Sequence, residues 1–154
     1  MEAEPQDRGG RLIWVVWVGA PSVAWAAHAL LGLSIVPTDL PSWIWLLGAA
    51  PLLEELVFRS LLQREVQDRL PGWLVSATGT KTLAGLSDHL ANVIAGLAFV
   101  AAHAPQQGWS AVWWILPSLA IGDTWRRQQK LWPCVAMHAW FNASLAAASL
   151  VAAR

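Results

Sequence analysis

The chain has 154 residues, enough for one domain, of which 56% are hydrophobic and 13% are charged. A typical soluble domain carries about 25% charged residues, so this composition, with a mean hydropathy of +0.43, excludes an ordinary soluble protein. The net charge is zero, which leaves no basic surface for a nucleic-acid partner. The single cysteine, Cys134, excludes an internal disulfide. We therefore expect an all-α, polytopic membrane protein.

Apolar runs along the chain predict a transmembrane helical bundle of about five spans, because a helix needs about 20 residues to cross a bilayer. We place these spans at residues 12–36, 42–63, 83 or 89 to 104, 109–121 and 131–153. A polar tail is expected at 1–11, and polar connections at 64–81, 105–108 and 122–130. The first run could be a cleaved signal peptide, but its length favours a retained span. The spans would form one membrane-embedded domain, residues 1–154, with its motif-bearing core at 41–145.

Cationic residues are distributed unevenly between the two predicted membrane faces. Arg154 falls on the far side and Arg59 within the second span, whereas eight others fall on the side of the N-terminus: Arg8, Arg11, Arg64, Arg69, Lys81, Arg126, Arg127 and Lys130. Cytoplasmic connections are enriched in Lys and Arg. We therefore expect a cytoplasmic N-terminus, in the plasma (inner) membrane of a bacterium.

The second span contains three ionisable residues within six positions, Glu54, Glu55 and Arg59. Each such side chain at the bilayer centre costs at least about 2.5–3.5 kcal/mol, so it must be paired or needed. Glu55 and Arg59 are four positions apart with the acid first, which favours an ion pair on one helix face. Glu54 points about 100° away from that pair and can face another helix. Pro51 removes one backbone hydrogen bond and is expected to kink the helix before the glutamates.

Three further polar residues lie within predicted spans, His103, His138 and Asn142. In lipid they would be unsatisfied, so we expect them to converge with Glu54 inside the bundle. A carboxylate beside an imidazole can hold a water molecule and take its proton. A second imidazole and an amide one turn apart can donate to a developing oxyanion. This set suffices for water attack on a peptide carbonyl without a covalent intermediate.

The same residues form three motifs in a fixed order. They are Glu-Glu-x-x-x-Arg, Phe-x-x-x-His and His-x-x-x-Asn, which begin at Glu54, Phe99 and His138. Their order, spacing and placement on three helices resemble those of the CAAX-protease and bacteriocin-processing (Abi/Rce1-like) family of glutamic intramembrane proteases.

The resemblance implies a metal-independent intramembrane endopeptidase without a cofactor. Its substrate would be a membrane-anchored protein or peptide, cleaved near a C-terminal membrane anchor or signal. The resemblance assigns water activation to Glu54 and His103, the oxyanion hole to His138 and Asn142, and structural support to Glu55 and Arg59.

Three alternatives stay open. The fold could be retained without catalysis, as an Abi-type immunity or membrane scaffold protein. Four histidines and two glutamates could bind zinc, although there is no His-Glu-x-x-His, and His28 and His89 are expected at other depths. Cys134, one turn before His138, could be a thiol nucleophile, although a small buried hydrophobic role is favoured. His28 is expected to be a hydrogen-bonded packing residue.

Counting along the helices gives conflicting depths for the site. Glu54 is ten residues from the inner connection at Arg64, or about 15 Å, and His138 is about 12 Å from Lys130. His103, in contrast, directly precedes the outer turn. The outward position of His103 favours an exported protein held by a C-terminal membrane tail as the substrate, with a prenylated cytoplasmic tail as the alternative.

Overall fold

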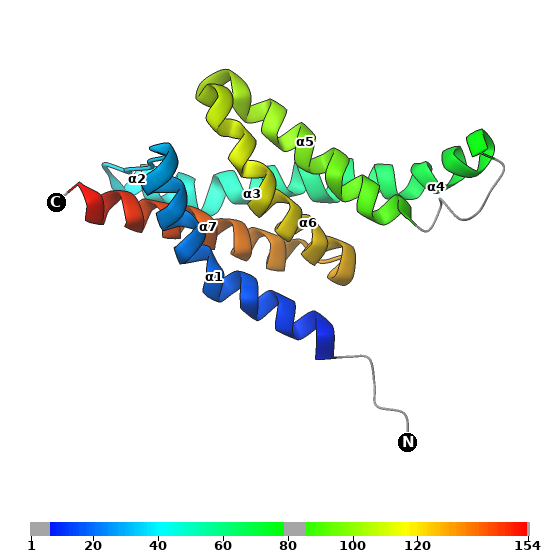
Figure 1. Cartoon of the computed structure of the whole chain (residues 1–154), viewed down its shortest axis with the longest axis horizontal. Coiled ribbons are helices and arrows are strands. Elements are labelled where there is room, and N and C mark those ends of the chain that lie inside the picture. The colour runs from blue at the N-terminus through cyan, green and yellow to red at the C-terminus, as the bar shows by residue number, and fades with distance from the viewer. Residues whose placement is uncertain (1–6, 79–85, 154) are drawn as a thin grey trace.

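The structure, a computed structural model, describes residues 7–78 and 86–153, and all regular elements in these ranges are helices (Figure 1). This confirms the all-α prediction. The central element is α7 (Leu131–Ala152), which packs against α1 (Asp7–Leu31), α3 (Ala50–Glu55) and α6 (Ile115–Gln128).

The bounds of α1 differ from the predicted first span at both ends. The helix begins at Asp7 and so includes residues 7–11 of the predicted polar tail, while residues 1–6 lie outside the described ranges. It ends at Leu31 although the apolar run continues, because Gly32 adopts a left-handed φ of +66°. His28 accommodates this end: its carbonyl accepts from the Gly32 N–H at 3.0 Å, and its Nδ1 lies 2.9 Å from the Leu33 carbonyl. His28 is therefore the packing residue that was predicted.

A nearly continuous helical path runs from Leu40 to Thr78 in five elements: α2 (Leu40–Ile44), η1 (Trp45–Ala49), α3, η2 (Leu56–Gln63) and α4 (Arg64–Thr78). Asp39 caps its start by accepting from the Ser42 N–H at 2.8 Å. The segments η1 and η2 are π-helical and flank the two glutamates, a distortion that is frequent at functional sites. The predicted polar connection at 64–81 is helical as far as Thr78, where charged pairs four positions apart support the helix. Residues 79–81 lie outside the described ranges.

Helices α5 (Ser87–Gln107) and α6 form a hairpin joined by the 3₁₀ segment η4 (Gly108–Trp114). Pro105 lies inside α5 and the chain turns at Gly108, where φ is +58°, so the predicted turn at 105–108 is wrong in its first part. The two helices approach closely at Gly122, where an added Cβ would lie 1.8 Å from Asn92 Oδ1. A larger residue at this position would therefore require the Asn92 side chain to move.

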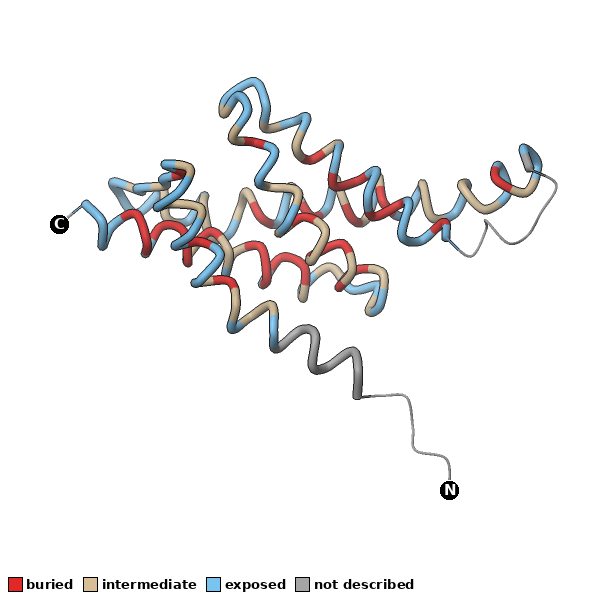
Figure 2. The backbone as a smooth tube through the Cα atoms, in the orientation of Figure 1, coloured by how far each residue is buried: buried red, intermediate tan, exposed pale blue. Residues whose placement is uncertain are grey.

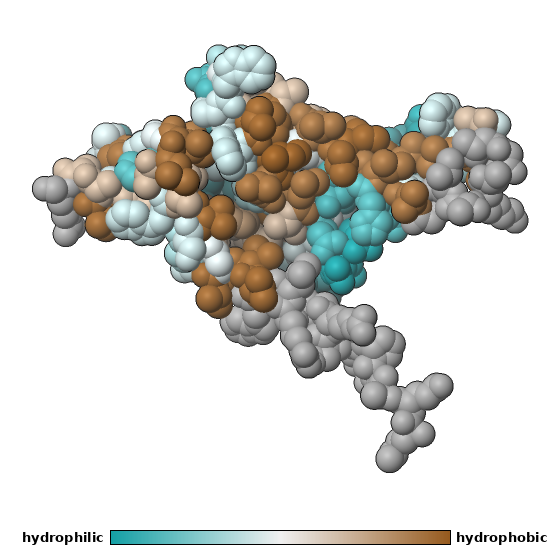
Figure 3. Space-filling model, in the orientation of Figure 1, coloured by the Kyte–Doolittle hydropathy of each residue, from teal (hydrophilic) through white to brown (hydrophobic). Residues whose placement is uncertain are grey.

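The end of α6 carries a cluster of charged residues, and the helix continues to Gln128 through most of the connection predicted at 122–130. Asp123 accepts hydrogen bonds from Arg127 at 2.6 Å and Arg126 at 2.7 Å. Burial of this carboxyl raises its pKa, but the hydrogen bonds from Arg127 and Arg126 outweigh burial and hold the pKa of Asp123 below its ordinary value. On the face drawn in Figure 3, a hydrophilic patch lies over this end of α6.

The interior holds polar side chains beside its apolar core clusters, and apolar side chains cover much of the exterior. The largest fully buried side chain is that of Arg59, whereas Leu30 is 81% and Trp109 91% exposed. Buried residues gather along α7 and the elements packed against it (Figure 2). This distribution suits a lipid surrounding, where charges must be paired inside. Among the described residues, α7 is long and apolar enough to cross a membrane, and Val15–Leu31 forms a shorter apolar helix. The five spans and the cytoplasmic N-terminus stay predictions.

Candidate active site

Glu55 and Arg59 form the ion pair that their spacing predicts. The Arg59 Nε donates to Glu55 Oε2 at 2.9 Å, and both side chains are completely buried. A buried charge is tolerated only when its partner and its remaining hydrogen bonds are in place. The structure confirms the pair.

The Arg59 guanidinium also binds residues that the sequence analysis did not single out. It donates to Ser118 Oγ at 2.7 Å, to the Ser118 carbonyl at 3.0 Å and to Gln63 Oε1 at 3.2 Å. Gln63 in turn donates to the Gly122 carbonyl at 3.0 Å. Gln63 lies four positions after Arg59, so spacing could have indicated it. Ser118 is 59 positions away on α6, and no local signal points to it.

Glu55 connects this buried pair to α7. Its Oε1 lies 2.7 Å from His138 Nδ1. A carboxylate that accepts from an arginine has no proton to donate, so Nδ1 of His138 carries the proton. In the neutral imidazole, Nε2 is then an acceptor.

Glu54 lies between two imidazoles. Its Oε2 is 3.6 Å from His138 Nε2 and 3.8 Å from His103 Nε2. Both distances exceed the roughly 3.2 Å limit of a direct N–H···O hydrogen bond. This oxygen is buried, and no hydrogen bond to it is found within the described part of the chain. The tertiary structure thus brings together side chains from α3, α5 and α7.

His103 is bound through the same ring nitrogen as His138, Nδ1. Its Nδ1 lies 2.9 Å from the Phe99 carbonyl, which can only accept, so Nδ1 is protonated and Nε2 is an acceptor in the neutral ring. The Phe99 ring stacks on His103 at 4.3 Å and meets His138 edge-on at 5.8 Å. Three acceptors therefore converge, Glu54 Oε2 and the two Nε2 atoms. Such a site favours a water molecule or a proton between them.

Asn142 lies one turn after His138 on α7 and donates from its amide nitrogen to the Leu46 carbonyl at 2.9 Å. Together with Arg59, both side chains line a cavity of about 20 Å³. This volume holds about one water molecule. Asn142 is thus beside His138, with one of its two amide hydrogens bound to the protein backbone.

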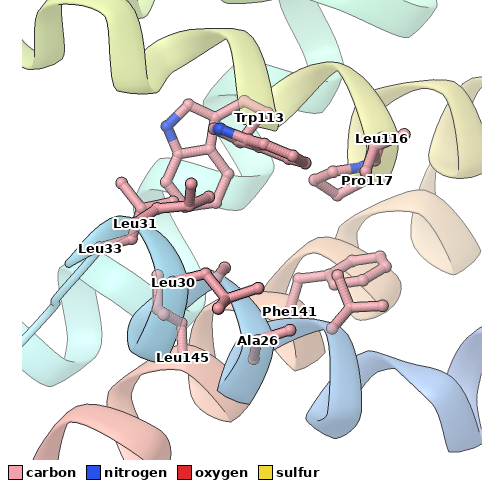
Figure 4. Close-up of a pocket in the computed structure, with 13 residues that line it drawn as sticks. Ala26, Leu30, Leu31, Leu33, Trp113, Leu116, Pro117, Phe141 and Leu145 are labelled. Atoms are coloured by element: carbon pink, nitrogen blue, oxygen red, sulfur yellow. The ribbon is translucent and has the colours of Figure 1, made fainter.

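An apolar cleft of about 300 Å³ adjoins this cavity (Figure 4). It lies between the C-terminal half of α1, the junction of η4 with α6, and α7. Trp114, Pro117 and Phe141 line both the cleft and the cavity. The cleft and the cavity therefore share a wall, and the lining of the cleft suits a hydrocarbon chain.

Cys134 is completely buried in a cluster with Ile121, Trp125 and Met137. Its thiol lies 3.5 Å from the Lys130 carbonyl. This position supports a packing role. Within residues 7–78 and 86–153, no group of three or more His, Cys, Asp and Glu is arranged to hold a metal ion.

Comparison with known proteins gives one informative result. The model of the Rce1-like family, the type II CAAX prenyl endopeptidases, matches residues 36–144. Neither the curated proteins nor the solved structures give a significant match. The matched range contains all the site residues named in the sequence analysis: Glu54, Glu55, Arg59, His103, His138 and Asn142.

Proposed function

Because the chain belongs to the Rce1-like family of type II CAAX prenyl endopeptidases, we propose that it is a glutamic intramembrane endopeptidase with Glu54 as its general base. The observation that carries this proposal is the position of Glu54 Oε2, buried between the Nε2 atoms of His138 and His103 at 3.6 and 3.8 Å. Glu54 Oε2 and the Nε2 atom of a neutral His103 can each accept one of the two protons of a water molecule.

The first step is attack of that water on the peptide carbonyl. Glu54 takes one proton as the water oxygen bonds to the carbonyl carbon, with His103 orienting the water. The resulting tetrahedral intermediate collapses when the C–N bond breaks. Glu54 then returns the proton to the leaving amine, so the carboxylate is regenerated without a covalent intermediate.

The developing oxyanion is stabilised by His138 and Asn142. Since Nδ1 of His138 is bound to Glu55, Nε2 donates only from the imidazolium form. Two carboxylates, the Arg59 guanidinium and one imidazolium sum to zero charge, which suits a desolvated site. Glu55, which Arg59 holds in place, accepts from Nδ1 of His138 and so orients Nε2 toward the site.

The substrate is a protein or peptide held in the membrane and cut near its C-terminal anchor or signal. The apolar cleft beside His138 would receive the hydrocarbon part of that anchor. We favour an exported protein with a C-terminal membrane tail, and a prenylated tail is the alternative.

Substitution of Glu54 tests the mechanism in detergent-solubilised protein. Glu54→Gln keeps the side-chain shape but cannot take a proton, so we expect loss of reporter cleavage with the folded yield unchanged. Cys134→Ala, made in parallel, should leave cleavage nearly intact, and a chelator should have little effect. Full activity of Glu54→Gln would contradict the role of Glu54 as general base, whereas absence of cleavage in the parent would favour the immunity or scaffold function.

A further inference from the structure

Pro51 lies at the junction of η1 and α3, one turn before the two glutamates, and its side chain is completely buried. At this junction the Ala50 N–H donates to the Trp45 carbonyl, which is the spacing of a π-helix. The next bond in this pattern would join the N–H of residue 51 to the Leu46 carbonyl. Proline has no N–H, so that bond cannot form.

The Leu46 carbonyl has no α-helical donor either. Its partner in an α-helix would be the Ala50 N–H, which is already bound to Trp45. A partly buried carbonyl without a main-chain donor is costly, so it accepts a hydrogen bond from a side chain where one is in reach. That donor is Asn142 Nδ2, at 2.9 Å.

We propose that Pro51 is a positioning residue for the active site: because it gives the Leu46 carbonyl no main-chain donor, that carbonyl accepts one amide hydrogen of Asn142, which fixes the amide beside His138. The proposal rests on the proposed function, because only in the proposed catalysis does the orientation of the Asn142 amide matter. An asparagine amide has two hydrogens. With the first on Leu46, the second has a fixed direction, and the Asn142 side chain lines the same cavity as His138.

Pro51→Ala tests this, because alanine restores the missing N–H and competes for the Leu46 carbonyl. The matched control is Pro41→Ala, since Pro41 lies in the first turn of α2, where its missing N–H would have no helical partner anyway. Both variants are prepared as full-length protein in detergent micelles.

The first measurement is the NMR spectrum of protein labelled with ¹⁵N-asparagine. Asn92 and Asn142 are the chain's two asparagines, and each donates one amide hydrogen to a backbone carbonyl, Asn92 to that of Leu119 at 3.0 Å. In Pro51→Ala, we expect the hydrogen-bonded signal of Asn142 to move to the position of a free amide. The two amide signals of Asn92 stay in place as an internal control. In Pro41→Ala, the amide signals of both asparagines are expected to stay unchanged. Unchanged amide signals of Asn142 in Pro51→Ala would overturn the proposal.

The second measurement is cleavage of two reporters, one with a prenylated tail and one with a C-terminal transmembrane tail. A donor misplaced by about 1 Å can cost about 10²-fold in rate, so we expect kcat to fall at least about tenfold in Pro51→Ala with KM little changed. An unchanged kcat with a released Asn142 would overturn the positioning role. If the parent cleaves neither reporter, the proposed function fails, while the spectrum still decides whether Pro51 fixes Asn142.

A double variant covers the case in which Pro51→Ala alone does not fold. In Asn142→Ala the Leu46 carbonyl loses its donor, and adding Pro51→Ala supplies a new one. Recovery of folded protein in the double variant therefore supports the proposal. Failure of the double variant to fold, under conditions where Asn142→Ala folds, would overturn it.

Discussion

The buried ion pair gives the sharpest prediction of stability. Arg59→Ala removes the partner of a completely buried Glu55 and deletes the hydrogen bonds to Ser118 and Gln63. Breaking one partner of a buried pair costs about 3–5 kcal/mol, because the other charge is left uncompensated. Whole domains are stable by only about 5–15 kcal/mol, so a large part of the stability should disappear.

Arg69→Ala is the matched control, because Arg69 pairs with Glu65 at the same spacing on α4, but with 82% of its side chain exposed. An exposed pair contributes at most about 1 kcal/mol. Unfolding is followed by titration with SDS in mixed micelles, with fluorescence of the 12 tryptophans as the signal. We expect Arg59→Ala to unfold at much lower SDS than the parent and Arg69→Ala to unfold near it.

The charge itself is tested by adding Glu55→Gln to Arg59→Ala. Neutralising the unpaired carboxylate should recover part of the lost stability. No recovery would show that packing, rather than an uncompensated charge, caused the loss. An Arg59→Ala protein as stable as the parent but inactive would refute the reasoning and place Arg59 on the substrate.

Three further outcomes are expected. Gly122→Ala should lower the free energy of unfolding by about 1–3 kcal/mol, because an amide oxygen lies 1.8 Å from the added Cβ; Gly48→Ala, with nothing within 4 Å, is the control and should lose no stability. Asp123 lies outside the predicted spans, and its pKa in the folded protein is depressed. Its ion pairs therefore stabilise the fold above about pH 3.9, the pKa of an aspartate in the unfolded chain. That contribution is lost as the pH falls through the folded pKa, so Asp123→Asn should show a shallower acid decline in unfolding experiments than the parent. For the membrane face, a cysteine at Ala104 in a Cys134→Ala background should react with an impermeant thiol reagent from outside; reaction from the cytoplasm alone would contradict the exported substrate.

The sequence by itself determined the family of the protein and predicted the members of its candidate site. Composition indicated membrane helices, and the order of three motifs indicated the family that the family comparison then confirmed over residues 36–144. The Glu55–Arg59 pair was predictable because it depends only on helical periodicity. Helix ends were less predictable: α4 and α6 continue past the apolar runs, since backbone hydrogen bonds form in polar segments too.

Only the tertiary structure decided how the helices meet at the site. Counting residues placed Glu54 and His103 at different depths, yet their side chains lie 3.8 Å apart. Estimating membrane depth from residue counts assumes that every helix is a straight α-helix and starts at the same depth. In this chain, η1 and η2 are π-helical and η4 is 3₁₀. The contacts of Arg59 with Ser118, and of Asn142 with Leu46, join helices far apart in the sequence. Such contacts depend on the register and crossing of packed helices, which no local pattern of residues specifies.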